Sequence, residues 1–146
     1  MPVGMDSAGL AHALRTDAEG RLEMVLAGGG AYLQMLRHTL SGALAAAAGT
    51  LRYPNRAGAA LTIREVHLAV NTAPAGAAII VDVNLNGTSI FSSSADRPQI
   101  AAGVYAGLSV LLGTPTWAVN AYLTVDVDQV GSSTPGADLV VTVVVG

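Results

Sequence analysis

Alternating apolar and polar positions dominate the chain from Leu61 to Gly146. Every second residue is large and apolar between Ile79 and Leu85, and the same pattern returns between Tyr122 and Gln129. A period of two is typical of a β-strand with one face in a core and the other face polar. The run from Leu139 to Val145 is apolar at nearly every position, which predicts a strand covered on both faces.

Turn residues separate these runs. Asn86-Gly87 is the strongest hairpin signal, because both central residues of the tightest hairpin turn adopt a positive φ. Within Leu61–Val70 the apolar positions change parity, which predicts a β-bulge near Arg64–Glu65. Further short strands are predicted at 88–92, 99–102 and 107–112. So many short strands predict an all-β fold, namely an antiparallel β-sandwich or jelly roll.

Residues 31–60 permit two structures. Leu33, Leu36, Leu40 and Leu44 follow a helical spacing, and the four alanines at 45–48 favour a helix as well. The alternative is a pair of strands, at 32–40 and 50–53, around a loop of small residues. The residues alone leave both possibilities open.

Residues 1–30 are expected to form an extended N-terminal arm, with the sandwich domain over residues 31–146. A turn is predicted at 17–20 and a strand at 21–26, and Gly28–Gly30 is interpreted as a hinge. The arm has too few large apolar side chains to bury a core of its own. It is therefore expected either to be disordered or to lie on another protein surface.

The composition is poor in charge. Only 12% of residues are charged, about half the usual fraction, and the mean hydropathy is +0.51. No apolar run is long enough for a transmembrane helix, so burial against other chains is the favoured explanation. A net charge of −3 without a basic run argues against nucleic-acid binding. The absence of cysteine excludes disulfide and thiolate chemistry.

Acidic side chains on neighbouring predicted strands are the best candidates for chemistry. Asp126 and Asp128 share one strand face, and Asp82 lies on a similar face with Asn84. Such carboxylates could bind Ca²⁺ or act as an acid–base pair. Alternation alone also explains them as a solvent-facing polar surface. No catalytic, cofactor-binding or metal-binding residue is therefore assigned.

Histidines and aromatic residues give weaker signals. The three histidines are far apart in the sequence, so no metal site is predicted from His12, His38 and His67. Trp117, with Tyr105 and Tyr122, could form a stacking platform for a sugar. A single tryptophan in a small sandwich is more often part of a core or an interface.

Four segments carry a resemblance to a known group of proteins. DVNLNGTSIF is followed, in order, by RPQIAAG, LTVDVDQVG and TPGADLVVTV. This succession resembles a β-rich module of tailed-bacteriophage virion proteins and covers roughly residues 50–146. The resemblance implies a jelly roll or related sandwich, usually trimeric, without enzymatic activity. It also favours strands over a helix in residues 31–60.

The function that the resemblance implies is structural. The chain is expected to be a capsid decoration, or cement, protein on the virion, bound to the major capsid protein on the outer surface of the head. The alternative is a tail-associated module that binds a receptor or a carbohydrate. Neither function uses a cofactor, a nucleic acid or a membrane.

Two sets of contact residues follow from this expectation. Residues 108–120 are more hydrophobic than such a module would have at that place, which predicts the homotrimer contacts Leu111, Leu112, Trp117 and Val119. The apolar stretches of the arm predict capsid contacts at Leu10, Leu14, Leu22, Met24 and Leu26.

Overall fold

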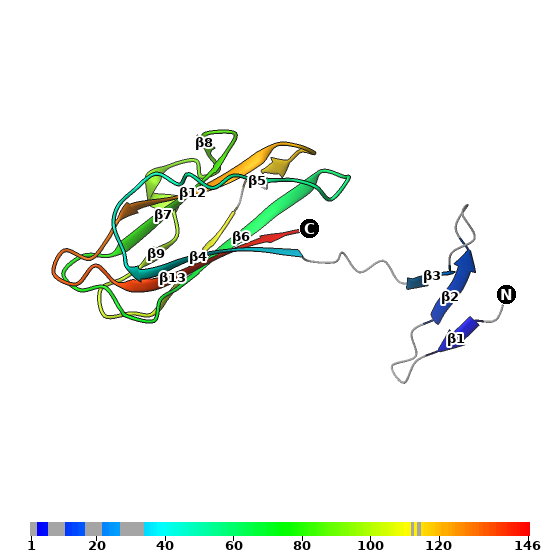
Figure 1. Cartoon of the computed structure of the whole chain (residues 1–146), viewed down its shortest axis with the longest axis horizontal. Helices are drawn as coiled ribbons and strands as arrows, with labels where there is room; N and C mark the ends of the chain where they lie inside the picture. Colours follow the sequence, from blue (N-terminus) through cyan, green and yellow to red (C-terminus); the bar gives the residue numbers. More distant parts are fainter. Residues whose placement is uncertain (1–2, 6–10, 17–21, 27–33, 112, 114) are drawn as a thin grey trace. The chain divides into compact units, whose positions relative to one another are not determined.

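The structure is a computed structural model that describes residues 3–5, 11–16, 22–26, 34–111, 113 and 115–146 (Figure 1). The chain divides into two compact units, Met1–Tyr32 and Leu33–Gly146. Within the described ranges the regular structure is antiparallel β-strand, apart from one 3₁₀ turn, η1 (Ser94–Asp96). No helix in these ranges is long and apolar enough to cross a membrane.

The first unit contains a three-stranded sheet in the order β1-β2-β3. Its strands are β1 (Val3–Met5), β2 (Ala11–Thr16) and β3 (Leu22–Leu26). The strand predicted at 21–26 is confirmed as β3, whereas the predicted turn at 17–20 lies outside the described residues. The two apolar stretches of the arm therefore pair with each other through their backbones.

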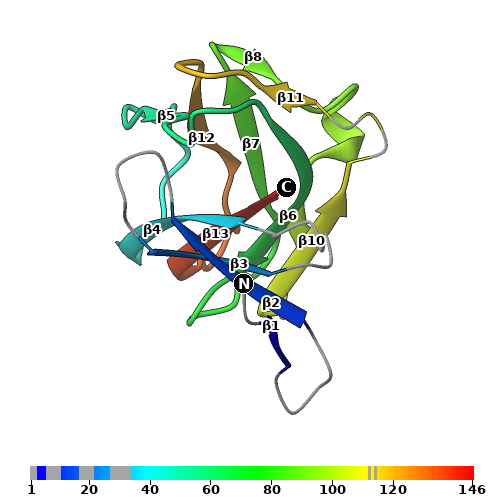
Figure 2. The same ribbon diagram turned by 90° about the vertical axis from the view of Figure 1, so that its right-hand side faces the viewer.

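The second unit is a sandwich of two sheets. The first has the order β10-β6-β13-β4, with bounds Ala106–Val110, Leu61–Ala69, Ala137–Val145 and Gln34–Ala43. The second has the order β5-β12-β7-β8, with bounds Tyr53–Pro54, Tyr122–Gln129, Ile79–Leu85 and Thr88–Ser89. Two short strands complete the sheets. Strand β9 (Gln99–Ile100) pairs with β7. Strand β11 (Thr116–Trp117), labelled in Figure 2, pairs with the first two residues of β6, whereas β10 pairs with the second half of β6.

The strand order is that of a jelly roll. Along the chain, β4, β6, β10 and β13 lie in one sheet, and β5, β7, β8 and β12 lie in the other. Most successive connections therefore cross from sheet to sheet, as in the eight strands of two Greek keys. The predicted all-β antiparallel sandwich is confirmed.

Strand β4 resolves the open question in favour of a strand over residues 34–43, whereas of the second predicted strand, at 50–53, only Tyr53 lies in a strand, the two-residue β5. β4 pairs with the valine-rich strand β13 from Gln34 to Ala43. Its side chains alternate in exposure, with Leu36, His38 and Leu40 more buried than their neighbours. Pairing along a long apolar strand outweighs the helical spacing of these leucines, because intrinsic propensity is a weak preference that tertiary contacts override.

The core lies between the two sheets. Strand β6 needs a bulge to turn the apolar side chains of both its halves into this core. Val144 is paired with Glu65 and Val145 with Ile63, so Arg64 is an extra residue and the predicted bulge is confirmed. The bulge lets both ends of β6 turn apolar side chains inward. The largest fully buried side chains come from both sheets and include Ile63, Val66, Leu68, Ile79, Val81, Val83, Ile100, Leu123, Leu139, Val141, Val143 and Val145.

The hairpin between β7 and β8 turns where predicted. Asn86 and Gly87 have φ values of 51° and 87°, both in the left-handed region that this turn needs. Its second strand ends at Ser89 rather than at residue 92. The Ile90 N–H still donates to the Val83 carbonyl at 3.0 Å. Beyond Ile90 the chain leaves the sheet as a loop.

Candidate functional site

Polar side chains gather on the outer face of β7 and β12, the strands that carry the predicted acidic pairs. Asp82 and Asn84 are buried there, so the expectation of a solvent-facing surface is wrong for these two residues. Asp126 lies opposite Asp82 in the strand pairing. The alternation was correctly predicted, but the loops that cover this face were not.

Arg97 covers one side of this polar cluster. It follows the η1 turn, and its Nη2 donates to Asp82 Oδ2 while its Nη1 donates to Asp128 Oδ2, each at 2.8 Å. The Ser89 hydroxyl donates to the other Asp82 oxygen at 2.7 Å. Both oxygens of Asp82 are therefore bonded, and the β8–β9 loop is fixed to the sheet.

Asp126 fixes the other side. Its Oδ2 accepts from Asn84 Nδ2 at 2.8 Å, and its Oδ1 accepts from the Gly49 N–H at 2.7 Å. Gly49 belongs to the connection between β4 and β5, where a Cβ atom would lie 2.0 Å from the Val125 carbonyl oxygen. Only glycine permits the backbone to approach β12 so closely.

The chemistry of this cluster is that of structural ion pairs. Burial raises the pKa of the Asp82 carboxyl above its ordinary value, although the Ser89 hydroxyl and Arg97 act in the opposite direction. A raised carboxyl pKa is a feature of general acids, but each oxygen of Asp82 and Asp126 already accepts a bond from protein. No group of three metal-ligating side chains occurs among the residues that the structure describes.

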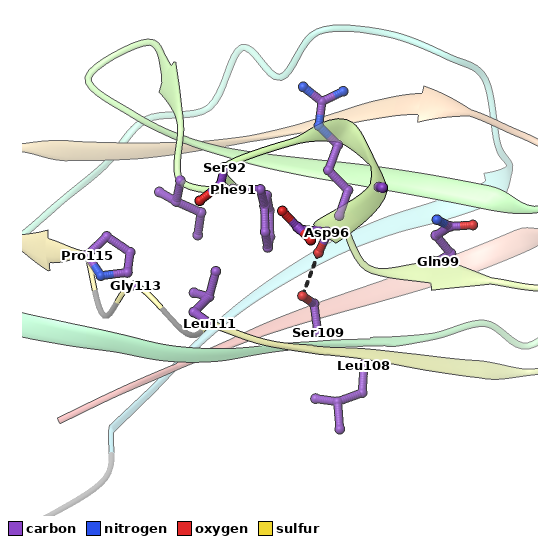
Figure 3. Close-up of a pocket in the computed structure, with 12 residues that line it drawn as sticks. Phe91, Ser92, Asp96, Gln99, Leu108, Ser109, Leu111, Gly113 and Pro115 are labelled. Carbon is purple, nitrogen blue, oxygen red and sulfur yellow. Dashed lines mark hydrogen bonds between the residues drawn. The ribbon is translucent and has the colours of Figure 1, made fainter.

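A groove of about 630 Å³ lies beside the Arg97 loop, between the segment from Ile90 to Gln99 and the segment from Leu108 to Pro115. Figure 3 shows Phe91 and Leu111 pointing toward one another from opposite walls, whereas Leu108 points away. The Ser109 hydroxyl donates to the Asp96 carbonyl at 2.6 Å and joins the two walls. The lining of the groove is mixed, since polar groups of Asp96, Arg97 and Gln99 lie beside its apolar side chains.

The four predicted trimer contacts do not share one environment. Leu111 and Trp117 are buried in the core, and Trp117 Nε1 donates to the Ala121 carbonyl at 2.8 Å. Val119 is exposed, and Leu112 lies outside the described residues. Val119 is the one member of the set that the structure shows on the surface, and its role in a trimer stays a prediction.

The predicted arm contacts fall mainly in the small sheet of the first unit. In the backbone register, Leu14 of β2 lies opposite Met24 of β3, and Leu22 and Leu26 are at the two ends of β3. Leu10 lies outside the described residues. The capsid role of these residues stays a prediction.

The histidines and the aromatic residues of the suggested platform are dispersed. His38 is buried, with Nδ1 at 2.6 Å from the Tyr53 hydroxyl, and His67 is exposed, at 2.8 Å from a Glu65 oxygen. His12 lies in β2. Trp117 belongs to the core and Arg52 covers the Tyr122 ring at 4.5 Å, so the rings do not form an exposed platform.

Exposed apolar side chains are the surface feature that the sequence analysis missed. Apart from Val119, they lie on β4, on the β4–β5 connection and around β10, and are Met35, Leu51, Val104, Tyr105 and Leu108. Met35 alternates with Leu36 along β4, so its exposure follows from a strand. It does not follow from the helix that the sequence also allowed for this segment.

Comparison with known proteins gives no match: no protein-family model matches the chain, and no curated protein is significantly similar to it.

Proposed function

We propose that this chain is a non-enzymatic virion protein, a capsid decoration subunit that binds the outer surface of a bacteriophage head and stabilises it. The observation that carries the proposal is a contrast in the sandwich. The buried carboxylate of Asp82 and the half-buried one of Asp126 are bonded to protein groups, while large apolar side chains such as Tyr105 and Leu108 are exposed. A surface of this kind favours contact with other protein subunits over chemistry on a substrate.

A homotrimer is part of the proposal. The low charge of the chain and its exposed apolar side chains favour burial against further copies. A head-to-tail ring closes with one pair of complementary patches per subunit, which suits a threefold position on an icosahedral shell. The major capsid protein is the second proposed partner.

A tail-associated receptor-binding or carbohydrate-binding module is the second candidate. The groove between Phe91 and Leu111 favours it, since its volume of about 630 Å³ falls within the range of about 300–1,000 Å³ that is usual for ligand sites. The absence of an exposed ring on the described walls of the groove, where Phe91 is buried, weighs against sugar stacking.

The experiment that tests the proposal mixes the purified chain with undecorated heads and follows co-sedimentation and the temperature at which the heads disassemble. The decoration function predicts saturable binding and a higher disassembly temperature. Binding to isolated tails or to a glycan array, without binding to heads, supports the second candidate instead.

A further inference from the structure

Strand β4 presents an unpaired edge. It is the last strand of the sheet β10-β6-β13-β4, and no strand among the described residues pairs with its outer side. It is ten residues long, contains no proline, and has Arg37 as its one side chain of fixed charge. Edges of soluble proteins are usually short, charged, interrupted or covered. A bulge at Ser41–Gly42 interrupts the far end of β4, so the strand offers a row of backbone N–H and C=O groups to an extended partner from Gln34 to Leu40.

An apolar pocket of about 290 Å³ lies directly beside this edge, on its inner flank. His38 and Leu40 of β4 form one wall, and the alanine-rich connection that includes Ala47 forms the other, with Val125 and Val127 of β12 also lining it. The connection is fixed in place, because Ala47 and Val127 exchange two backbone hydrogen bonds of 2.9 Å. The pocket is therefore preformed.

The two faces of β4 specify different neighbours for an added strand. Leu36, His38 and Leu40 are turned toward the pocket side, whereas Arg37 and Thr39 are exposed on the other face. Side chains of an added strand would alternate in the same way. An apolar residue would enter the pocket, and its neighbour would lie beside Arg37, which has no ion-pair partner among the described carboxylates.

We propose that β4 is a docking edge for an extended segment of the coat protein, with an aliphatic side chain in the pocket and an acidic side chain beside Arg37. Strand addition supplies affinity through backbone hydrogen bonds and specificity through such alternate side chains. The choice of the coat protein as the source rests on the proposed function. The edge, the pocket and the charge of Arg37 are features of this chain and do not depend on that choice.

The test uses the full chain and the acetylated, amidated peptide Thr-Val-Glu-Val-Thr as the probe. In nuclear magnetic resonance titrations, the expected result is saturable binding with shifts and slowed amide exchange in Gln34–Ser41. The same peptide with alternate amides N-methylated, which cannot complete the ladder, should not bind. No saturable binding at millimolar peptide, shifts that map to another surface, or equal binding of the methylated peptide would each overturn the proposal.

Two matched variants test the side-chain preferences. Arg37→Glu should weaken binding of the peptide about threefold, and a peptide with Lys in place of Glu should restore it, as expected for a cross-strand charge pair. Ala47→Leu, which fills the pocket from an exposed position, should weaken binding, whereas Ala101→Leu, an exposed change elsewhere, should not. Equal loss in both leucine variants would contradict a role for the pocket.

Hydrogen exchange with undecorated heads then identifies the source of the strand. Protection of β4 on head binding supports the coat protein. Binding to heads without protection of β4 overturns this inference and leaves the decoration function intact, whereas failure to bind heads counts against the decoration function itself.

Discussion

Arg97 Nη2 lies 2.8 Å from Asp82 Oδ2 on the outer face of β7, where Asp82 is buried. This ion pair attaches the β8–β9 loop to the sheet and shapes one wall of the groove, since Arg97 lines it. The loop is thus held by charge, whereas the strands beneath it are held by their apolar core.

Replacing Arg97 should therefore destabilise the sandwich. Arg97→Met leaves the buried Asp82 without its cationic partner, and we expect a loss of about 2 kcal/mol in the free energy of unfolding. Urea denaturation measures this loss. Arg56→Ala is the control, because the exposed bond of Arg56 to Asn120 should be worth less than about 0.5 kcal/mol. Equal losses of unfolding free energy in the two variants would show that the Arg97–Asp82 ion pair stabilises the fold no more than an exposed hydrogen bond does.

The close approach of Gly49 to β12 gives a second prediction. Gly49→Ala places a Cβ atom against the Val125 carbonyl and should displace the connection, with a loss of about 1–3 kcal/mol. Gly113→Ala, which meets nothing within 4 Å, should change stability by less than about 0.5 kcal/mol. Thermal unfolding of both variants checks the difference. A Gly49→Ala protein as stable as the wild type contradicts the described packing.

His38 should make the fold sensitive to mild acid. Burial lowers the pKa of His38 below its ordinary value of 6.5, so the folded state resists protonation. The unfolded chain takes up the proton as the pH falls through 6.5, and the free energy of unfolding should decrease from there until the lower folded pKa is reached. Urea midpoints at pH 7.5 and 5.5 measure this decrease.

Two histidine variants separate this effect from other titrations. His38→Gln should lose part of the pH dependence, while His67→Gln, at an exposed position, should keep it. An unchanged dependence in His38→Gln assigns the acid sensitivity to another group.

Deletion of residues 1–27 should leave the sandwich folded, because these residues belong to a separate compact unit. The midpoint of thermal unfolding of the second unit should be unchanged. Under the decoration proposal, the truncated chain should bind heads more weakly, since the arm is a predicted anchor. Unchanged affinity for heads would show that the arm is not an anchor.

Backbone features were the most predictable part of the fold. The positive φ of Asn86 and Gly87 follows from residue chemistry at two positions, and the bulge at Arg64 follows from a change of parity inside one strand. Both depend on neighbours in sequence. They could therefore be predicted without knowing which strands pair.

Contacts between distant segments were not predictable in the same way. The burial of Asp82 depends on Ser89 of β8 and on Arg97 of the β8–β9 loop, and the pattern of alternating residues does not reveal that cover. Trp117 was assigned to a contact surface because it lies in an apolar loop-like segment, but it fills the core. An apolar residue in a short connection looks the same in sequence whether it faces inward or outward.

The most direct test of the decoration function is a cryo-electron microscopy map of the virion that contains this chain. The decoration function predicts density for the jelly-roll sandwich on the outer surface of the head, with three copies around a threefold or quasi-threefold position. Density for the sandwich at the tail, or a particle without it, would contradict the account.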